Sequence, residues 1–380
     1  MKVMTILGIR PDWIMMCKVI ERLDRDFEHI LVHSGQHYSY KLDKIFFDEL
    51  GVREPDYHLA IGSKTQGQQV GQLMMESEKV MLKEKPDLVL TFSDANPSMA
   101  AISATKIHIQ TAHIEAGMRS YDWRMPEEKN RRVVDSFSDY FFTPTEISFN
   151  TLLSEGVAKE KIYLVSKTNI DVLLFFKHNI DNSTILETAD LVPKEYFLFE
   201  MHRPENINDK IVLGNILKSL DVIYKKYGCK IIAPLHPRAV DGIKRHGFKI
   251  PNGVHVIDLV GYFDFNKLEK HALCTVADSG TTQEECCMYR TPHVTIRIST
   301  ERPETAEIGS NIVVGDLKSE NILNAVETML NRNTNWPIPY WPGASNKIVD
   351  TLLDIEDEIV TPKMWWNNKP ISYELKRKVV

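Results

Sequence analysis

Short apolar runs alternate with longer amphipathic stretches along this chain, and the alternation starts afresh near its middle. Such runs predict strands buried on both faces, and helical patterns between them predict a parallel sheet covered by helices. The runs of the first half are Val3–Leu7, His29–His33, Leu88–Phe92, Thr111–Glu115, Tyr140–Pro144 and Ile162–Val165. Those of the second half are Tyr196–Glu200, Lys230–Pro234, Val254–Ile257, Cys274–Ala277, Val294–Arg297 and Ile312–Val314. Helical patterns include Leu42–Leu50, Gln66–Leu82 and Glu146–Glu155.

The length of the chain favours two such units, because 380 residues are too many for one ordinary core. We therefore expect an α/β protein with two doubly wound Rossmann-like domains that face a cleft. The expected N-terminal domain spans residues 1–171 and the C-terminal domain residues 172–344, with the boundary near Asp171–Val192. A helix at Asn346–Glu358 is expected to begin a tail, 345–380, that packs back on the first domain, with Trp365-Trp366 docked.

Charge and composition exclude several classes of protein. The formal net charge is −6 without a long basic run, so we expect no nucleic-acid partner. No stretch of about 18 apolar residues occurs, so no membrane span is expected. The N-terminus lacks the apolar core of a signal peptide. An odd number of cysteines without C-x-x-C spacing favours reduced thiols and a cytoplasmic location. These cysteines are Cys17, Cys229, Cys274, Cys286 and Cys287.

Two kinds of cofactor are not expected. No H-E-x-x-H motif occurs and C-x-x-C spacing is absent, so a metal centre is not indicated. The turn after the first predicted strand, Gly8-Ile9-Arg10-Pro11-Asp12, is not the glycine-rich dinucleotide fingerprint, which argues against a nicotinamide cofactor.

Arg10 on this turn has two possible roles. It could bind a phosphate beside free helical N–H groups, or it could have no function beyond its place on the turn.

Carboxylates follow three successive predicted elements of the first domain. Glu115 ends a buried strand, where an unpaired carboxylate would be costly. Asp94 follows the strand before it, and Glu127 and Glu128 open a later helix. Structural alternatives exist, since Asp94 or Asn96 could cap a helix and first-turn acids suit the helix dipole. Together, however, the carboxylates form a potential cluster at the cleft that could supply both an acid and a base.

Cations and a glycine turn follow the strands of the second domain. His202-Arg203 and His236-Pro237-Arg238 come after two of these strands, where a diphosphate could lie. The turn Ser279-Gly280-Thr281 opens a helix whose N–H groups form an anion site, although Ser279 or Thr281 could simply cap that helix. Glu285, further along the helix, could accept hydrogen bonds from ribose hydroxyls, and Arg302 adds a cation near another strand end.

In order along the chain, these motifs are G-I-R-P-D, S-G-Q-H, S-D-A-N, H-I-E-A-G-M-R, P-E-E-K-N-R, M-H-R-P-E-N, L-H-P-R, D-S-G-T-T-Q-E-E and T-E-R-P-E. Over residues 2–355 the series resembles the non-hydrolysing UDP-N-acetylglucosamine 2-epimerase family, including its capsular and O-antigen branches. The resemblance implies a glycosyltransferase-B-like fold and a reaction that needs neither metal nor nicotinamide. It also implies a UDP-sugar substrate and a homodimer.

The resemblance further implies roles for individual residues. Asp94, Glu115 and Glu127 match the catalytic carboxylates of the family, with Arg131 beside them and His202 near the sugar–phosphate bond. The residues that match substrate-binding positions are Arg10, Ser279 and Gly280 for the diphosphate, Glu285 for the ribose, Arg302 for the sugar, and Thr281 and His236 less specifically. The implied reaction expels UDP, forms a 2-acetamidoglycal, and adds UDP back after C2 is reprotonated on its other face.

The chain also departs from the family pattern. Met15 stands where a lysine is common, Ser166-Lys167 replaces a usual Gly-Asn, and Thr281 replaces a second glycine. The stretches His33–Arg53 and Gly261–Glu285 look more like the capsular branches, one of which acts on a uronic acid. The candidate cations for a uronate are Arg119, Lys167 and Arg302. Two other functions stay open: a UDP-sugar glycosyltransferase of the same fold, and a UDP-sugar-binding protein that has lost activity.

Overall fold

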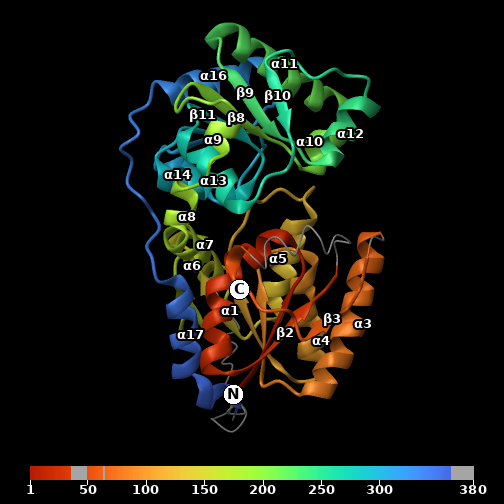
Figure 1. The fold of residues 1–380 in the computed structure, drawn as a ribbon. Coiled ribbons are helices and arrows are strands. Elements are labelled where there is room, and N and C mark those ends of the chain that lie inside the picture. The colour runs from red at the N-terminus through yellow and green to blue at the C-terminus, as the bar shows by residue number, and fades with distance from the viewer. Residues whose placement is uncertain (36–48, 63–64, 361–380) are drawn as a thin grey trace, which may run out of the picture.

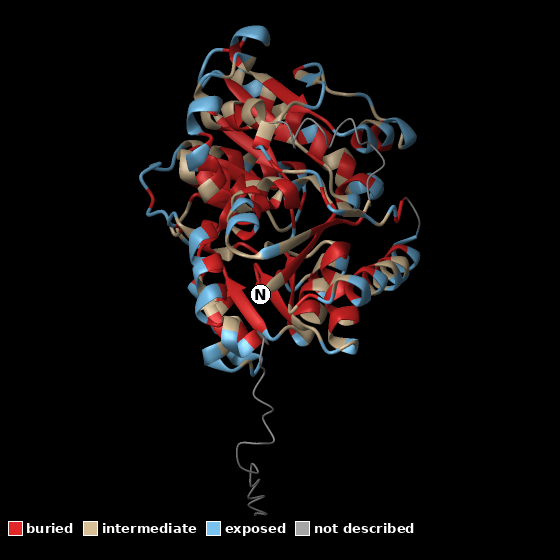
Figure 2. Cartoon of the chain, turned by 60° about the horizontal axis from the view of Figure 1, so that its bottom comes forward, coloured by how far each residue is buried: buried red, intermediate tan, exposed pale blue. Residues whose placement is uncertain are grey.

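The chain folds around two parallel β-sheets, one above the other in Figure 1, as seen in a computed structural model that describes residues 1–35, 49–62 and 65–360. Figure 2 shows that both sheets are buried and that exposed residues gather on the outer helices. The two-domain, doubly wound α/β fold class expected from the sequence is confirmed. No described helix is long and apolar enough to cross a membrane.

The first sheet has the strand order β3-β2-β1-β4-β5-β6-β7 and is parallel throughout. Its central strands β1 and β4 are almost entirely buried, as expected for apolar strands with helices on both faces. The strands are β1 Lys2–Leu7, β2 Glu28–His33, β3 Tyr57–His58, β4 Leu88–Phe92, β5 Gln110–Ile114, β6 Tyr140–Thr143 and β7 Ile162–Leu164. The two-residue strand β3 was not expected, because it has no apolar run of its own.

The second sheet has the order β10-β9-β8-β11-β12-β13 and is also parallel. Its strands are β8 Tyr196–Glu200, β9 Lys230–Pro234, β10 Val254–Ile257, β11 Cys274–Ala277, β12 His293–Thr295 and β13 Asn311–Val313. Each expected strand of the second half is present, and β12 and β13 begin one residue earlier than expected.

Helices connect and cover the strands. They are α1 Arg10–Asp26, α3 Gln66–Glu84, α4 Ala100–Lys106, α5 Pro126–Phe137, α6 Glu146–Ser154, α7 Thr168–Phe175, α8 Lys177–Asp181, α9 Ile185–Thr188, α10 Pro204–Asn208, α11 Lys210–Tyr227, α12 Pro237–Arg245, α13 Tyr262–His271, α14 Gly280–Tyr289, α15 Pro303–Glu307, α16 Ser319–Leu330, α17 Ala344–Asp354 and α18 Glu356–Val360, with 3₁₀ turns η1 Asn96–Met99 and η2 Lys159–Lys161. Most of the expected helix Leu42–Leu50, the Gln36-His37 pair of the S-G-Q-H motif and Trp365-Trp366 lie outside the described residues.

The last helices return to the first sheet, as Figure 1 shows for α17 beside α1. Ile348 and Leu352 are fully buried in the same core as Met16 and Leu23 of α1. Arg22 of α1 donates to Asn346 at 2.6 Å and to Asp350 at 2.7 Å. We call the part of the chain around the first sheet, with these helices, the first lobe, and the part around the second sheet the second lobe.

The position of the site follows from the strand order. In the first sheet the order reverses between β1 and β4, and in the second between β8 and β11. Ligands of open parallel sheets bind outside the carboxyl ends of the strands at such reversals. The turns after these four strands begin at Gly8, Ser93, Met201 and Asp278, so half of the predicted site residues lie at the two reversals, namely Arg10, Asp94, His202, Ser279, Gly280 and Thr281.

Candidate functional site

The turn after β1 is tightly packed. A Cβ on Gly8 would lie 1.9 Å from Ser34 Oγ and 2.6 Å from Pro97 Cγ, so only glycine fits. The buried Asp12 carboxylate accepts hydrogen bonds from the N–H groups of Gly8 and Ile9 at 3.1 and 3.2 Å. Burial raises the pKa of Asp12 to about 7, and the nearby carboxylates of the site add to the rise. Asp12 therefore closes the turn that carries Arg10.

Arg10 itself reaches the second lobe. Its guanidinium donates to the backbone carbonyl of Val260 at 2.9 Å, next to the N-terminus of α13. The interpretation that Arg10 merely decorates its turn is therefore wrong, because it joins the two lobes at the edge of the site.

Asp94 forms an ion pair with Arg131 of α5 and does not cap a helix. The capping residue of η1 is Ala95, and the Asn96 amide donates to Gln66 and Gln69, so the capping alternative is wrong for both residues. Burial raises the pKa of Asp94, but the Arg131 guanidinium outweighs it and leaves that pKa below its usual value. Asp94 is therefore an ionised carboxylate.

A buried histidine supports the loop that carries Asp94. His113 of β5 has Nε2 2.8 Å from the carbonyl oxygen of Ser93 and Nδ1 2.7 Å from Asp135 of α5. Ser93 and Glu115 have φ values of +56° and +68°, a region that costs a non-glycine residue about 1–2 kcal/mol. Such strain persists only where surrounding contacts impose it, and it often marks functional sites.

Glu115 pairs with a buried lysine from another loop. Its side chain is 4% exposed and accepts a hydrogen bond from Lys167, which precedes α7. Lys167 also lies 2.7 Å from Glu284 of α14, and Glu284 lies 2.5 Å from Arg302. This row of alternating charges crosses from the first lobe to the second.

The first turn of α5 contains two glutamates in different surroundings. Glu128 is buried and accepts from the backbone N–H of Ser120 at 2.7 Å and from Arg131 at 3.0 Å, so its contacts hold the chain in place. Glu127 is about one-third exposed, and its nearest cation is Arg203 of the second lobe at 3.8 Å. Burial raises the pKa of Glu127 in spite of Arg203.

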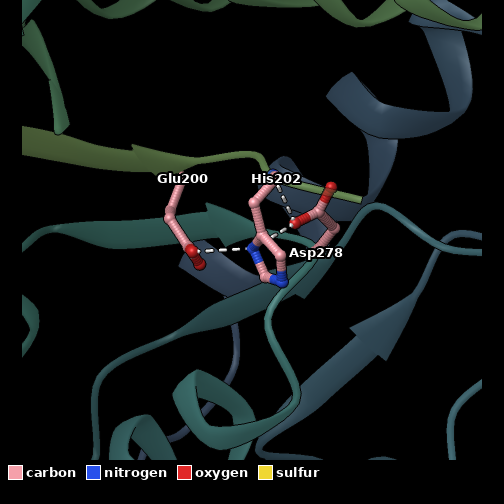
Figure 3. A group of neighbouring side chains, drawn as sticks. All are labelled: Glu200, His202 and Asp278. Carbon is pink, nitrogen blue, oxygen red and sulfur yellow. Dashed lines mark hydrogen bonds and ion pairs between the residues drawn. The ribbon is translucent and has the colours of Figure 1, made fainter. Parts of the chain in front are cut away.

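Opposite these carboxylates, His202 is held by two acids, as Figure 3 shows. Its Nδ1 lies 2.8 Å from Glu200 and 3.1 Å from Asp278. Burial lowers the pKa of His202, but the two carboxylates outweigh it and raise that pKa to about 10. His202 is thus a positively charged imidazolium at neutral pH.

The same three side chains are close enough to hold a metal ion, but their hydrogen bonds suit the imidazolium better. Asp278 accepts from the N–H groups of His202 and Arg203 at 3.0 and 3.1 Å and from Asn206 at 2.9 Å. These donors occupy both of its oxygens, and both acids already accept from the histidine. The group therefore orients a charged histidine.

Helix α14 begins at the second reversal. Ser279 is its capping residue but makes no side-chain cap hydrogen bond, so the simple-cap interpretation fails for Ser279. Its hydroxyl lies 3.2 Å from that of Thr281. A Cβ on Gly280 would lie 2.4 Å from Arg302 Nη1, so glycine lets Arg302 lie across the helix start. The first N–H groups of α14 and the Arg302 guanidinium together form a site suited to an anion.

Two further predicted binding residues, Glu285 and His236, do not take part in the row of charges formed by Glu115, Lys167, Glu284 and Arg302. Glu285 of α14 is buried beside the carboxyl group of Glu269 on α13, and burial raises the pKa of Glu285 to about 7. Burial and the Glu285 carboxylate also raise the pKa of Glu269, so Glu285 and Glu269 can share a proton.

His236 is exposed and caps α12, accepting from the N–H of Arg238 at 3.2 Å.

The structure also identifies residues whose contacts the sequence did not predict. Glu301 pairs with Arg297 at 2.6 Å and lies 3.7 Å from Arg131, while Asn169 donates to Glu284 at 2.6 Å. Glu284 and Glu301 stand within the motifs D-S-G-T-T-Q-E-E and T-E-R-P-E. Their place in these motifs is the sequence feature that could have indicated a role in the site. The three candidate cations for a uronate, Arg119, Lys167 and Arg302, are all paired with carboxylates.

Comparisons with known proteins agree with this geometry. The profile of a family described as UDP-N-acetylglucosamine 2-epimerase matches residues 21–353. A UDP-N-acetylglucosamine 2-epimerase of Methanococcus maripaludis is 43% identical and covers 93% of this chain and 98% of its own length. A UDP-2,3-diacetamido-2,3-dideoxy-D-glucuronate 2-epimerase of Pseudomonas aeruginosa is 37% identical and covers 93% and 99%.

A solved structure is similar throughout. The Methanocaldococcus jannaschii UDP-GlcNAc 2-epimerase, in complex with UDP-GlcNAc and UDP, superimposes with a TM-score of 0.88 at 41% identity, covering 93% of this chain and 99% of its own. The match extends over both lobes and hence over both sides of the site. This chain belongs to the UDP-N-acetylglucosamine 2-epimerase family.

Proposed function

We propose that this protein is a non-hydrolysing UDP-sugar 2-epimerase that interconverts UDP-GlcNAc and UDP-ManNAc. One observation carries the proposal: three carboxylates of the first lobe lie opposite cations and a helix N-terminus of the second, an arrangement that supports binding of a diphosphate there. The carboxylates are Asp94, Glu115 and Glu127, and the opposing groups are His202, Arg203, Arg302 and the N-terminus of α14. The related epimerases that act on UDP-GlcNAc support the same substrate.

The chemistry explains why both sets of groups are needed. The hydrogen on C2 of the sugar is not next to a carbonyl, so a base cannot remove it directly. When the C1–O bond breaks, UDP leaves with the electron pair, and the cation at C1 makes the C2 proton acidic. The His202 imidazolium, Arg302 and the α14 N–H groups stabilise the departing diphosphate. Arg10 closes the site from the first lobe.

Proton transfer then falls to the carboxylates. Asp94 and Glu115 have pKa values below the usual range and act as bases, whereas the pKa of Glu127 is raised and it can hold a proton. One base removes the C2 proton and leaves a glycal with a C1=C2 double bond. An acid on the other face returns a proton to C2, and a UDP oxygen adds to C1. Arg131 keeps Asp94 in place, and Glu285 with Ser279, Gly280 and Thr281 binds the nucleotide.

A neutral N-acetylated sugar is favoured over a uronate. A uronate needs a cation in addition to those assigned to the diphosphate, which include Arg302. The other two candidates, Arg119 and Lys167, have buried side chains whose charges are held by carboxylates. UDP-2,3-diacetamido-glucuronate and UDP-2-acetamido-2,6-dideoxy-talose are therefore the second and third substrates to test.

Location, assembly and domain motion belong to the same proposal. The protein works in the cytoplasm, as its five free cysteines, four of them buried, favour a reducing compartment. It forms a homodimer, and residues 1–171 and 172–344 move as two domains that close over the substrate. Light scattering after gel filtration tests the dimer, and a molar mass equal to one chain would contradict it.

The test of function uses the purified protein and each UDP-sugar without an acceptor, with products separated by chromatography and identified by NMR. A second UDP-sugar epimer is the expected product, formed fastest from UDP-GlcNAc. A glycosyltransferase would need an acceptor and give no epimer. Binding of UDP without any turnover of the three sugars would instead favour a protein that has lost activity.

A further inference from the structure

Lys167 is a completely buried lysine between the two lobes. It follows β7 and precedes α7, and its side chain has no exposed surface. A buried ammonium is costly unless it is paired. Lys167 has two carboxylate partners, Glu115 of the first lobe and Glu284 of the second, and it also donates to Met118 Sδ at 3.4 Å.

The two partners depend on Lys167 to different degrees. Glu284 also accepts from Asn169 at 2.6 Å and from Arg302 at 2.5 Å. For Glu115, the hydrogen bond seen within the described residues comes from Lys167. Removing the ammonium therefore leaves Glu284 with partners but takes from Glu115 its closest cation.

We propose that Lys167 is a positioning residue of the epimerase reaction: its ammonium keeps Glu115 ionised and aimed at C2, and Glu284 of the second lobe fixes the ammonium in place. The inference rests on the proposed function. Lys167 need not touch the substrate, because it acts on the reaction through the carboxylate of Glu115.

The charges around the pair determine the direction of the effect. Burial raises the pKa of Glu115, while Lys167 and then Arg302 lower it and leave it below its usual value. The carboxylates of Asp94 and Asp12 oppose them, and Glu304 faces Lys167 from α15. Without Lys167, burial and the neighbouring acids are opposed mainly by Arg302, so the pKa of Glu115 rises. A base must be ionised to act, so the acidic limb of the kcat–pH profile moves to higher pH.

The experiment compares Lys167→Met and Lys167→Gln with the wild-type enzyme over pH 3.5–9, a range that includes the acidic limb of an enzyme whose Glu115 has a pKa below its usual value. We expect the acidic limb of kcat to move up by about one pH unit or more, which is a tenfold loss of kcat on that limb. The KM for the UDP-sugar should stay within about threefold. Gln can still donate a hydrogen bond but carries no charge, so it should behave like Met if charge is what matters.

The control is Lys194→Met, which also removes an ammonium group. Lys194 is an exposed residue of the second lobe whose ammonium donates to two backbone carbonyl groups, those of Lys270 and Ala272 at 3.1 and 2.8 Å, and not to a carboxylate of the site. Its pH profile should equal that of the wild type. A Lys167→Met enzyme that binds UDP and has an unshifted acidic limb would overturn the inference.

Glu284→Gln provides a second test with the opposite sign, and it decides the matter if the Lys167 variants do not fold. Loss of the competing carboxylate leaves the ammonium to Glu115 alone, so the acidic limb should move to lower pH. A limb that stays in place or moves to higher pH contradicts the inference. The proposed function fails separately, if the wild-type enzyme forms no second epimer at all.

Discussion

At the scale of single residues, the three predicted catalytic carboxylates have different surroundings. Arg131 holds Asp94, Lys167 holds Glu115, and Glu127 is more exposed, with Arg203 no nearer than 3.8 Å. These environments lower the pKa values of the first two and raise that of Glu127. Groups whose pKa values are pushed apart in this way can divide the roles of base and acid.

Replacing each carboxylate by its amide tests this division. In Asp94→Asn, Glu115→Gln and Glu127→Gln we expect kcat to fall by about 10²–10⁴-fold, the usual contribution of a positioned acid or base. Affinity for UDP, measured by calorimetry, should change little, because His202 and α14 bind the diphosphate. Glu76→Gln is the control, because the partly exposed Glu76 on α3 pairs with Lys79 of the same helix and not with a residue of the site. Near-wild-type turnover in all three variants would show that the proposed mechanism is wrong.

The residues of the site could be predicted from the sequence where they stand in motifs at strand ends. Their partners could not. The sequence predicts Lys167 as a departure from the family pattern and as a candidate cation for a uronate, but nothing in its neighbourhood points to Glu115, which is 52 residues away. His113 was part of a motif, but its contact with the Ser93 carbonyl exists only once β4 and β5 pair.

At the scale of elements, several turns place a non-glycine residue in the left-handed region. Ser93, Glu115 and Ser166 follow β4, β5 and β7 with φ values of +56°, +68° and +76°. Ser166 stands where the family usually has glycine, and its hydroxyl accepts from the N–H of Trp341 at 3.0 Å. A side-chain contact thus compensates for part of the backbone strain.

Two helix ends allow a matched test of whether side-chain contacts compensate for the strain of a left-handed backbone. Lys85 and Arg290 end α3 and α14 in the left-handed conformation, with φ values of +52° and +56°. Lys85 is exposed, so Lys85→Gly should stabilise the protein by about 0.5–1 kcal/mol. Arg290 donates to the carbonyls of Thr334 and Trp336 at 3.0 and 2.8 Å, and losing bonds from a charged group costs about 1.5–3 kcal/mol.

Arg290→Gly should therefore lower the free energy of unfolding, whereas Lys85→Gly should raise it. The measurement is the midpoint of urea unfolding followed by circular dichroism. Equal shifts in the two midpoints would mean that backbone strain alone determines the effect.

The elements themselves were largely predictable. Buried parallel strands appear as continuous apolar runs, and for that reason β1, β4, β8 and β11 were correctly placed. The edge strand β3 was missed because two residues carry no periodicity. The domain limits at 171 and 344 remain a proposal. The packing favours a first domain that extends past residue 171, because Val172, Phe176 and Ile180 lie in the same core as α1.

At the scale of the whole molecule, the two strand reversals face each other and side chains join them. Arg10 contacts the Val260 carbonyl, Lys167 contacts Glu284, and Arg131 lies 3.7 Å from Glu301. The sequence predicted a cleft between two domains, because the fold class requires one. It did not predict these pairs, whose members are more than 100 residues apart in the chain.

The most direct test of the central claim is solvent exchange at C2. The protein is incubated with UDP-GlcNAc in deuterated water and both epimers are followed by NMR. The account predicts that UDP-ManNAc appears with deuterium at C2 and that deuterium then enters the remaining UDP-GlcNAc. A second epimer that keeps its original hydrogen, or unchanged UDP-GlcNAc in the presence of measurable UDP binding, would contradict epimerisation by proton removal and return.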